Sequence, residues 1–426
     1  MTGDFNINKL SDDLFRHEAG KMVAVLTKIL GTENLDISED VVQDTFMNAM
    51  QVWALKGVPD NPSAWLFRAA KNKAIDVLRR NKFSNQIDFN DPERTLLRSE
   101  YTLTAIIEKR WRDDEIQDDL LRMMYACCHP EISEENQITL ILKTLCGFST
   151  SEIAKAFLTS EDTVSKRLYR TKNFFRERKI KPGFPEAGQL RSSTEAVLRA
   201  IYLIFNEGYN ATHTSELIRK DLLDQAMYLC KLLAGNKNTG IPEVYAAMAL
   251  MYFHTSRINS RINKQGEIIL LAQQDRTLWN RHLIAEGNDF LNKAAFGDRI
   301  SSYHAEAAIA YEHCIAETFE ETNWRNILNY YDMLAAINHN SVVMLHRLTV
   351  IFKVFGATKT IEEIEHAVEY KADWEKNYLY YGLLGDVYAD LAPGKSKENY
   401  ETAFRMTKSE AEKKLLLKKV AGLGLP

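Results

Sequence analysis

Proline, cysteine and long apolar runs are all scarce in this sequence, and each shortage excludes a class of protein. Only 9 of its 426 residues are prolines, so few positions interrupt helices. Its 5 cysteines are an odd number spread over a long chain, which favours a reducing compartment over a disulfide-linked scaffold. No uninterrupted apolar run approaches the roughly 18 residues of a membrane-spanning helix, and the N-terminus lacks the basic start and apolar core of a secretory signal. We therefore expect a soluble, cytoplasmic protein without a membrane segment.

The abundant residues favour helices. Alanine, leucine, lysine and glutamate are frequent, long β-branched runs are few, and apolar residues recur at helical spacing along most of the chain. We therefore predict an all-α protein. At roughly 150 residues per domain, the length predicts about three domains. A hydrophobic content of 45% is enough to build their cores.

Two breaks in the helical pattern divide the chain. Residues 84–120 carry ten acidic and five basic side chains, and residues 181–189 concentrate two prolines and two glycines. In the last third, Gly385 and Tyr400 approximate the spacing of a tetratricopeptide repeat (TPR), which predicts stacked helical hairpins. The predicted segments are a helical module at 1–84, an acidic linker at 85–112, a second module at 113–182, a linker at 183–195 and a larger TPR-like helical domain at 196–426.

The net charge of −4 hides segments of opposite sign. It is the sum of 54 basic and 58 acidic side chains, and taken alone it argues against a nucleic-acid-binding protein. Residues 71–82, however, sum to +4 and residues 161–181 to +5, with the acidic segment between them. Basic helical segments of this kind suit binding to phosphates.

A helix is expected to begin with Ser38 as its N-cap and to present two different faces. Val42, Phe46 and Trp53 form its apolar face by their spacing, so this side belongs to a core. Two interpretations of the other face remain open: it is exposed to solvent, or it docks a protein partner. This polar face carries Asp40, Gln43, Asp44 and Met47.

The next helix is expected to start at Pro62, and its outer side combines cations, amides and aromatic rings. Such a combination suits DNA, because cations bind phosphates, amides read base edges and rings stack on unpaired bases. The alternative is a surface helix in which an arginine pairs with Asp76 while Trp65 belongs to the core. The candidate DNA-binding residues are Trp65, Arg68, Asn72, Lys73, Asp76, Arg79 and Arg80.

Residues 147–178 predict a helix-turn-helix. Ser149 and Glu152 form a capping box that opens a short helix, and Ser160 or Thr159 can cap a second helix after a tight turn. The inward face of this second helix is predicted to carry Val164, Leu168, Thr171 and Phe175. Its outward face matches a recognition helix in the major groove of DNA. The candidate contacts are Thr163, Ser165, Lys166, Arg167 and Arg170.

Three strings in these segments resemble the extracytoplasmic-function (ECF) class of bacterial sigma factors, within the sigma-70 family. EDVVQDTF at 39–46 is similar to the helix that these proteins dock on the clamp of RNA polymerase. NPSAWLFRAAKNKAIDVLRR at 61–80 resembles their promoter-melting and −10 segment, and GFSTSEIAKAFLTSEDTVSKRLYRTK at 147–172 their −35 reader. The resemblance implies a sigma factor that is no enzyme, needs no cofactor, and binds core RNA polymerase and promoter DNA. The acidic linker would thread the nucleic-acid channel of polymerase.

Later strings are similar to the subgroup of this class that has a TPR-like C-terminal extension. Examples are MMYACCHPEIS at 123–133, IYLIFNEGYNAT at 201–212 and LLAQQDRTLWN at 270–280. The resemblance implies either regulation in cis by the extension or a protein partner for it. Polar and aromatic residues in these strings are candidates for a binding concavity, or equally for structural caps and buried pairs. They are Asn206, Glu207, Tyr209, Gln274, Asp275, Arg276 and Trp279.

Two other classes of function stay open from the residues. A ligand-sensing helix-turn-helix repressor would use the C-terminal domain as its sensor, but it leaves the residues around 61–83 unexplained. An enzyme fused to a DNA-binding module would need a catalytic motif, and none of the common ones occurs. Cys127, Cys128 and His129 lack the spacing of a zinc site, so we expect buried thiols and no metal.

Overall fold

The computed structural model describes residues 7–81, 94–157, 159–210, 218–263, 268–407 and 409–424. Its described residues are helical or irregular, apart from one isolated β-bridge between Ile262 and Ile268. The prediction of an all-α protein is confirmed. The chain divides into two compact units, Met1–Glu207 and Gly208–Pro426.

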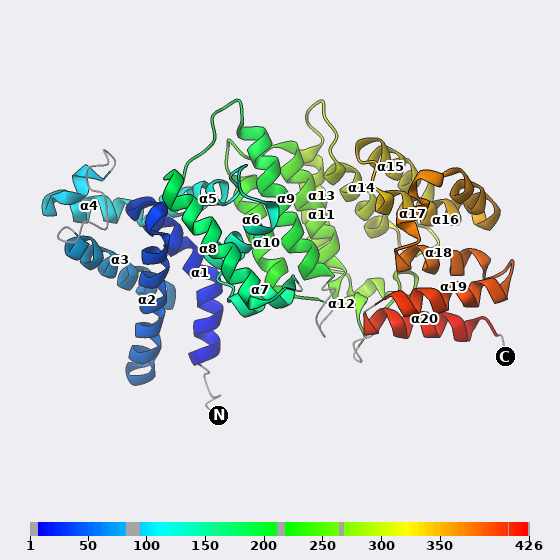
Figure 1. The fold of residues 1–426 in the computed structure, drawn as a ribbon, viewed down its shortest axis with the longest axis horizontal. Coiled ribbons are helices and arrows are strands. Elements are labelled where there is room, and N and C mark those ends of the chain that lie inside the picture. The colour runs from blue at the N-terminus through cyan, green and yellow to red at the C-terminus, as the bar shows by residue number, and fades with distance from the viewer. Residues whose placement is uncertain are drawn as a thin grey trace. The chain divides into compact units, whose positions relative to one another are not determined.

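The first unit runs from blue to green in Figure 1. Gly31 and Gly57 follow its first two long helices with φ angles of 94° and 83°, a conformation that glycine adopts without a steric cost. A π-helical turn, η3 (Ile141–Leu145), and two short 3₁₀ turns, η1 (Thr32–Asn34) and η2 (Thr95–Arg98), join longer helices. These are α1 (Ile7–Leu30), α2 (Leu35–Lys56), α3 (Pro62–Asn81), α4 (Glu100–Arg110), α5 (Asp113–Cys127), α6 (Glu134–Leu140), α7 (Thr150–Ala156), α8 (Glu161–Arg178) and α9 (Leu190–Tyr209).

The core of the first unit includes part of the segment that was expected to be a linker. Both η2 and α4 lie within 85–112, and their Leu97, Leu103 and Ile107 are buried in a cluster with residues of α1, α3 and α5. The four-residue spacing of Leu103 and Ile107 places both on one face of α4, which explains how an acidic segment contributes to a core. Residues 85–93 lie outside the described residues. The second half of the expected linker is therefore a structured part of this unit.

The second unit continues with helices that pack mainly on their neighbours in sequence, as in an array of helical hairpins. Short turns η4 (Leu271–Gln273), η5 (Arg276–Leu278) and η6 (Val368–Tyr370) interrupt the array. Its helices are α10 (Lys220–Gly235), α11 (Pro242–Ser256), α12 (Ile258–Arg261), α13 (Arg281–Ala294), α14 (Ser302–Ile315), α15 (Trp324–Ile337), α16 (Ser341–His366), α17 (Lys371–Trp374), α18 (Tyr378–Tyr388), α19 (Pro393–Met406) and α20 (Glu410–Gly422).

The hairpin of α18 and α19 brings together the residues that suggested a tetratricopeptide repeat. A side chain at Gly385 would collide with the ring of Tyr400, so the two helices approach closely at this point. Ser396 donates a hydrogen bond of 2.7 Å to the carbonyl oxygen of Gly385, and the Tyr400 hydroxyl donates to Asp386 at 2.6 Å. The predicted helical-hairpin character of this unit is confirmed.

Among the described residues one helix, α16, is long and apolar enough to cross a membrane. Gly356, in its middle, has a φ of 81° and a ψ of −174°, so the helix is interrupted there. Leu345 and Leu348 of α16 pack in one apolar cluster with Trp374 of α17. Part of the apolar surface of α16 thus packs in a protein core, and a single interrupted helix of this kind is weak evidence for a membrane location.

Candidate polymerase and promoter interface

The predicted docking face lies on α2. Asp40, Gln43, Asp44 and Met47 are all exposed, and Met47 has 60% of its surface accessible. The helix begins at Leu35, not after Ser38. The prediction that Ser38 is the N-cap is wrong, because this buried side chain instead bonds to the carbonyl oxygen of Asn34, 3.4 Å away in the preceding turn.

The predicted DNA-binding residues on α3 divide into exposed and half-buried groups. Trp65 is half-buried, with its ring 5.6 Å from that of Trp53, and the Lys73 ammonium lies 2.8 Å from a carboxylate oxygen of Asp44 on α2. This ion pair brings the end of the docking face beside the candidate DNA-binding face. The exposed group consists of Arg68, Asn72, Asp76, Arg79 and Arg80.

Helices α7 and α8 form the predicted helix-turn-helix. The backbone N–H of Ser149 donates to the Glu152 carboxylate at 2.8 Å and the N–H of Glu152 to the Ser149 hydroxyl at 3.2 Å, which confirms the capping box. Ser160 caps α8 by accepting from the N–H of Thr163 at 3.1 Å. The predicted inward face is confirmed, since Val164, Leu168, Thr171 and Phe175 are buried.

The outward face of α8 carries the five predicted groove contacts. Ser165, Lys166 and Arg170 are exposed, whereas Thr163 and Arg167 are half-buried. Lys166 pairs with Asp162 one turn earlier, with its ammonium 2.7 Å from the carboxylate. Because both of these side chains remain mostly exposed, the pair contributes little to stability and can be broken easily by a phosphate.

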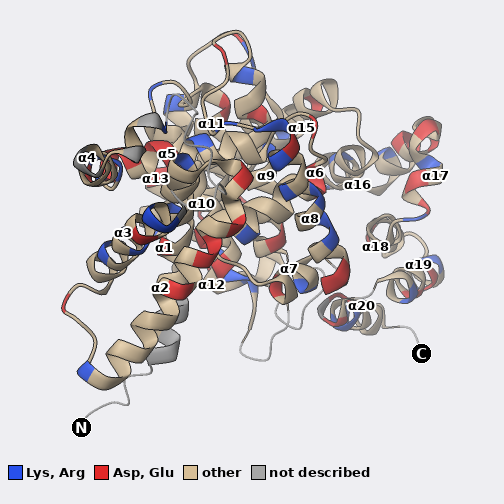
Figure 2. Ribbon diagram, turned by 60° about the vertical axis from the view of Figure 1, so that its left-hand side comes forward, with Lys and Arg blue, Asp and Glu red and all other residues tan. Residues whose placement is uncertain are grey.

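The C-terminal half of α8 is joined to α2 by an ion-pair cluster, which we call the α2–α8 clasp: Asp36, Glu39, Lys172 and Arg176. The Lys172 ammonium lies 2.6 Å from Asp36 and 2.7 Å from Glu39, and Arg176 lies 3.1 Å from Asp36. Burial lowers the pKa of Lys172, but the two carboxylates outweigh it and the pKa is raised. Figure 2 colours the opposite charges on the two helices.

A further contact joins the helix-turn-helix to α1. Arg16 of α1 pairs with Glu152, the residue that completes the capping box of α7. Thr32 of η1 donates a hydrogen bond to the carbonyl oxygen of Ile180, just after α8. The candidate −35 reader is therefore fastened to α1 and η1 and, through the α2–α8 clasp, to α2.

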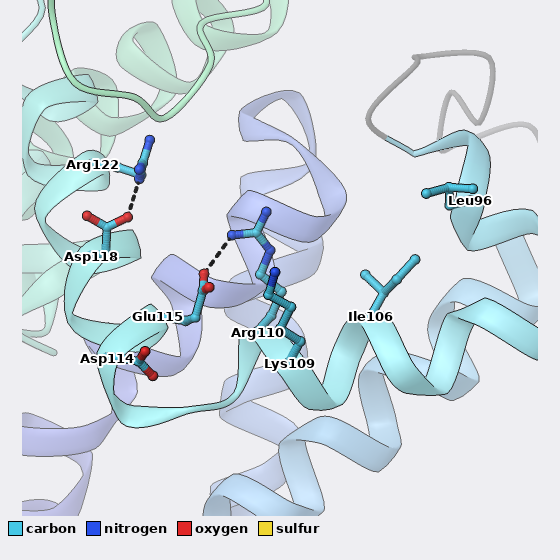
Figure 3. A pocket seen from close by; sticks show the side chains of 8 residues that line it. All are labelled: Leu96, Ile106, Lys109, Arg110, Asp114, Glu115, Asp118 and Arg122. Atoms are coloured by element: carbon cyan, nitrogen blue, oxygen red, sulfur yellow. Dashed lines mark hydrogen bonds and ion pairs between the residues drawn. The ribbon is translucent and has the colours of Figure 1, made fainter.

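An open pocket of about 640 Å³ lies between α4 and α5. Figure 3 shows Arg110 pointing toward Glu115 and Arg122 toward Asp118 on its walls, at 3.0 and 2.7 Å. The lining residues are Leu96, Ile106, Lys109, Arg110, Asp114, Glu115, Asp118 and Arg122. These internal pairings make the pocket a poor candidate for binding a charged ligand.

The predicted residues of the C-terminal half have different roles. Asn206 and Glu207 lie near the end of α9 in the first unit, and the other five belong to the second. Asp275 caps η5 by accepting from the N–H of Thr277 at 2.9 Å. Gln274 bonds through its amide to the carbonyl oxygen of Ile269 at 3.1 Å. These two polar side chains thus have structural roles.

Tyr209, Arg276 and Trp279 meet around two arginines that the sequence alone did not point to, Arg257 and Arg261. The guanidinium carbon of Arg257 lies 5.7 Å from the centre of the Trp279 ring, and that of Arg261 lies 3.8 Å from the centre of the Tyr209 ring. In the sequence, the one feature that could have pointed to Arg257 and Arg261 is their four-residue spacing, which places them one helical turn apart after an apolar helix.

The cysteines provide no metal site. All five are buried free thiols, so the predicted burial of Cys127 and Cys128 is confirmed. Burial raises the pKa of Cys128 and of Cys146 to about 12, so both stay protonated and unreactive at neutral pH. In the part of the chain that the structure describes, no three His, Cys, Asp or Glu side chains gather to hold a metal ion.

Comparison with known proteins decides the class. Family models for sigma-70 region 2 and sigma-70 region 4 match residues 14–84 and 122–174. The ECF RNA polymerase sigma factor SigL of Mycobacterium tuberculosis is 31% identical over 133 residues, which are 31% of this chain and 68% of SigL. The chain belongs to the ECF sigma factors. Sigma-70 regions 2 and 4 imply interaction with core RNA polymerase and promoter DNA, and sigma factors are not enzymes.

The similarity of this sigma factor to known proteins continues into its extension. A family of unknown function (DUF6596) matches residues 193–295. An uncharacterized protein of Rhizobium meliloti (strain 1021) is 32% identical over 358 residues, which are 84% of this chain and 83% of the relative. No solved structure matches the sigma factor. Nothing in these comparisons favours a repressor.

Proposed function

We propose that this ECF sigma factor binds the clamp of core RNA polymerase through the exposed face of α2. The observation that carries this assignment is the exposure of Met47 between acidic and amide side chains, because an exposed apolar side chain with a polar rim suits a protein partner. Asp40, Gln43 and Asp44 supply that rim. The sigma factor acts in the cytoplasm, where polymerase and promoter DNA are found.

The exposed side of α3 receives the opened −10 strand, and the outward face of α8 reads the −35 element in the major groove. Unstacking bases costs a few kcal/mol per step, and stacking on aromatic rings returns about 1–3 kcal/mol per base. Trp65 and the cations Lys73, Arg79 and Arg80 supply stacking and phosphate contacts. On α8, Arg167 and Arg170 are placed to reach bases and phosphates.

The sigma factor cannot bind the −10 and −35 elements at the same time while the α2–α8 clasp is closed. The −10 and −35 positions are about 25 base pairs apart, or roughly 85 Å of B-DNA at 3.4 Å per base pair. Helix α2 contacts both α3 and α8, and a helix is about 10–12 Å wide. The two DNA-binding helices are therefore only some 20–30 Å apart. We interpret the closed form as the resting state, which polymerase must open.

The C-terminal extension regulates this opening in cis or through a protein partner. The functional segments are then a polymerase and −10 module to residue 84, a −35 module at 113–182 and the extension from 196. A chain that stops after Glu207 tests the regulation, because it keeps the whole first unit. Promoter-specific transcription that equals that of the full chain in the absence of other proteins would remove the regulatory role in cis.

Reconstituted transcription tests the polymerase assignment. The purified protein with core RNA polymerase should start promoter-specific RNA synthesis, and Asp44→Lys should weaken its binding to polymerase about tenfold by reversing one charge in the face. Asp390→Lys is a matched control, since this exposed acid lies in the turn after α18 in the second unit. Equal polymerase affinity of the two variants would contradict the assignment of α2.

A further inference from the structure

We propose that the second unit contains a binding site for a small phosphate-bearing anion, formed by Arg257, Arg276 and Trp279. This site goes beyond the sigma-factor function, which rests on helices of the first unit. The three residues follow one another around the connection from α11 to α13: Arg257 at the end of α11, Arg276 in η5 and Trp279 directly after it.

The two guanidinium groups share one aromatic ring. The guanidinium carbon of Arg276 lies 4.5 Å from the centre of the Trp279 ring, and that of Arg257 lies 5.7 Å from it. Arg257 also approaches the Tyr209 hydroxyl, 3.4 Å from its Nη2, and Arg261 covers the Tyr209 ring at 3.8 Å. Three cationic side chains therefore gather in a small volume bounded by two rings.

Each of the three site residues has a buried N–H group without a partner. Arg257 Nε, Arg276 Nη2 and Trp279 Nε1 have no hydrogen-bond partner among the described residues. Arg257 and Trp279 are themselves only 8% and 3% exposed. Buried donors in proteins are nearly always satisfied, so three orphaned donors around one ring require an acceptor from outside the chain.

The charges of these arginines are also not balanced by close ion pairs, although the charge of Glu320 favours the charged form of Arg276. Within the described ranges, no carboxylate forms an ion pair with Arg257, Arg261 or Arg276. Burial, with the charges of Arg257 and Arg276 as further causes, lowers the pKa of the adjacent His313 to about 3, so this histidine is neutral. A buried cation without a counter-charge is costly. An anion bound here would supply the missing charge.

The structural roles of the arginines use only part of their donors. Arg276 Nη1 donates to the carbonyl oxygens of His313 and Ala316 at 2.8 and 2.6 Å, near the end of α14. Its Nη2 stays available. A phosphate group has several acceptor oxygens that point in different directions, and guanidinium groups recognise it with paired hydrogen bonds. Arg276 is itself partly exposed, so the anion can enter from the solvent side.

Calorimetric titration of the full chain with inorganic phosphate and with glycerol 3-phosphate tests the site. Each probe is compared with potassium chloride at equal ionic strength. We expect saturable binding of at least one probe and a rise in Tm that grows with its concentration. Binding of both probes identifies free phosphate as sufficient, and binding of glycerol 3-phosphate alone identifies an organic phosphate. Binding of neither probe overturns the site.

Two variants and one control locate the binding. Arg276→Lys keeps the charge but removes the forked donors, and Arg257→Gln removes a buried charge; each should weaken binding about tenfold or more. Arg405→Gln changes an exposed arginine of the same unit and should bind as the unaltered protein does. Unchanged affinity in both site variants would overturn the proposal. Because binding is measured without polymerase, its failure leaves the sigma-factor assignment untouched.

Discussion

Lys172 of α8 and Glu39 of α2 lie with their charged atoms 2.7 Å apart, and their side chains are only 18% and 12% exposed. Lys172 also contacts Asp36, so one ammonium group binds two carboxylates of α2. Partial burial strengthens such a pair, because water screens it less. The proposed −35 reader, α8, is thus fastened by charge to the proposed docking helix, α2.

Removing either partner should loosen the clasp. We expect Lys172→Gln and Glu39→Gln each to lower the free energy of unfolding of the first unit by about 1–3 kcal/mol, and the double variant to lose less than the sum. Urea unfolding measures this. Lys166→Gln is the control, since Lys166 and Asp162 are also 2.7 Å apart but are 66% and 71% exposed. A loss for Lys166→Gln as large as for Lys172→Gln would refute the role of burial.

Arg167 and Arg170 should differ in what they read. Arg167 lies nearer than Arg170 to the N-terminal end of α8, the end of a recognition helix that contacts base edges, and we expect Arg167→Ala to relax sequence preference at one −35 position by about 1–3 kcal/mol. The exposed Arg170 should act on phosphate, so that Arg170→Ala weakens all sequences alike and reduces the salt dependence. Binding of polymerase holoenzyme to a randomised −35 library measures both. If Arg167→Ala instead weakened the binding of all −35 sequences equally, Arg167 would contact phosphate and not a base.

Gly385 and Gly382 provide a matched pair on α18. An added methyl group at Gly385 would collide with the ring of Tyr400, whereas one at Gly382 would meet no atom within 4 Å. We expect Gly385→Ala to destabilise the second unit by about 1–3 kcal/mol through overpacking. Gly382→Ala should be neutral or stabilising by up to about 1 kcal/mol, because alanine favours helix. Thermal unfolding of the two variants measures the contrast, and equal Tm values would contradict the close approach of α18 and α19.

Asp119 makes the stability of the first unit depend on pH. Burial raises its pKa to about 6 from the usual 3.8, although Arg110 opposes this at 3.9 Å. The native state therefore holds the proton more tightly than the unfolded chain, and the free energy of unfolding falls as the pH rises from about 4 to about 6, by up to about 3 kcal/mol.

Asp119→Asn should remove this fall, because an amide does not titrate, and should stabilise the first unit above pH 6. Urea unfolding at a series of pH values measures the slope. Asp113→Asn, at an exposed position of the same helix, should keep the dependence of the unaltered protein. If both variants kept the same slope, another group would be responsible.

Local patterns were predictable from the sequence wherever the residues that interact are close in the chain. The capping box of Ser149 and Glu152 and the inward face of α8 depend on three- and four-residue spacing, and both are confirmed. Ser38 failed as a cap because the preceding turn, η1, leads directly into α2, so the N-cap position is Asn34, four residues earlier. A serine inside a helix looks the same in the sequence as a serine at the N-cap. The two can be distinguished only when the conformation of the preceding residues is known.

Contacts over long distances in sequence were not predictable. The clasp joins residues 36 and 172, and the arginine cluster joins residues 209, 257 and 276, so neither set has a spacing to recognise. Helix α4 was not predicted for another reason: it contains more charged residues than buried apolar ones, so its apolar face is hard to recognise in the sequence. The family resemblance identified the two DNA-binding regions but gave no information on how they pack together.

The hydrogen bond of 2.6 Å between the hydroxyl groups of Tyr125 and Thr194 constrains how such a chain could arise by gene fusion. Thr194 lies in the segment that looked like a free connection, yet its hydroxyl satisfies a buried tyrosine of α5. A gene shortened at this point would encode a product with an orphaned hydroxyl group in its core. Recombination that adds or removes the extension is therefore tolerated best beyond α9, because the shortened and the extended proteins then both keep a complete first unit.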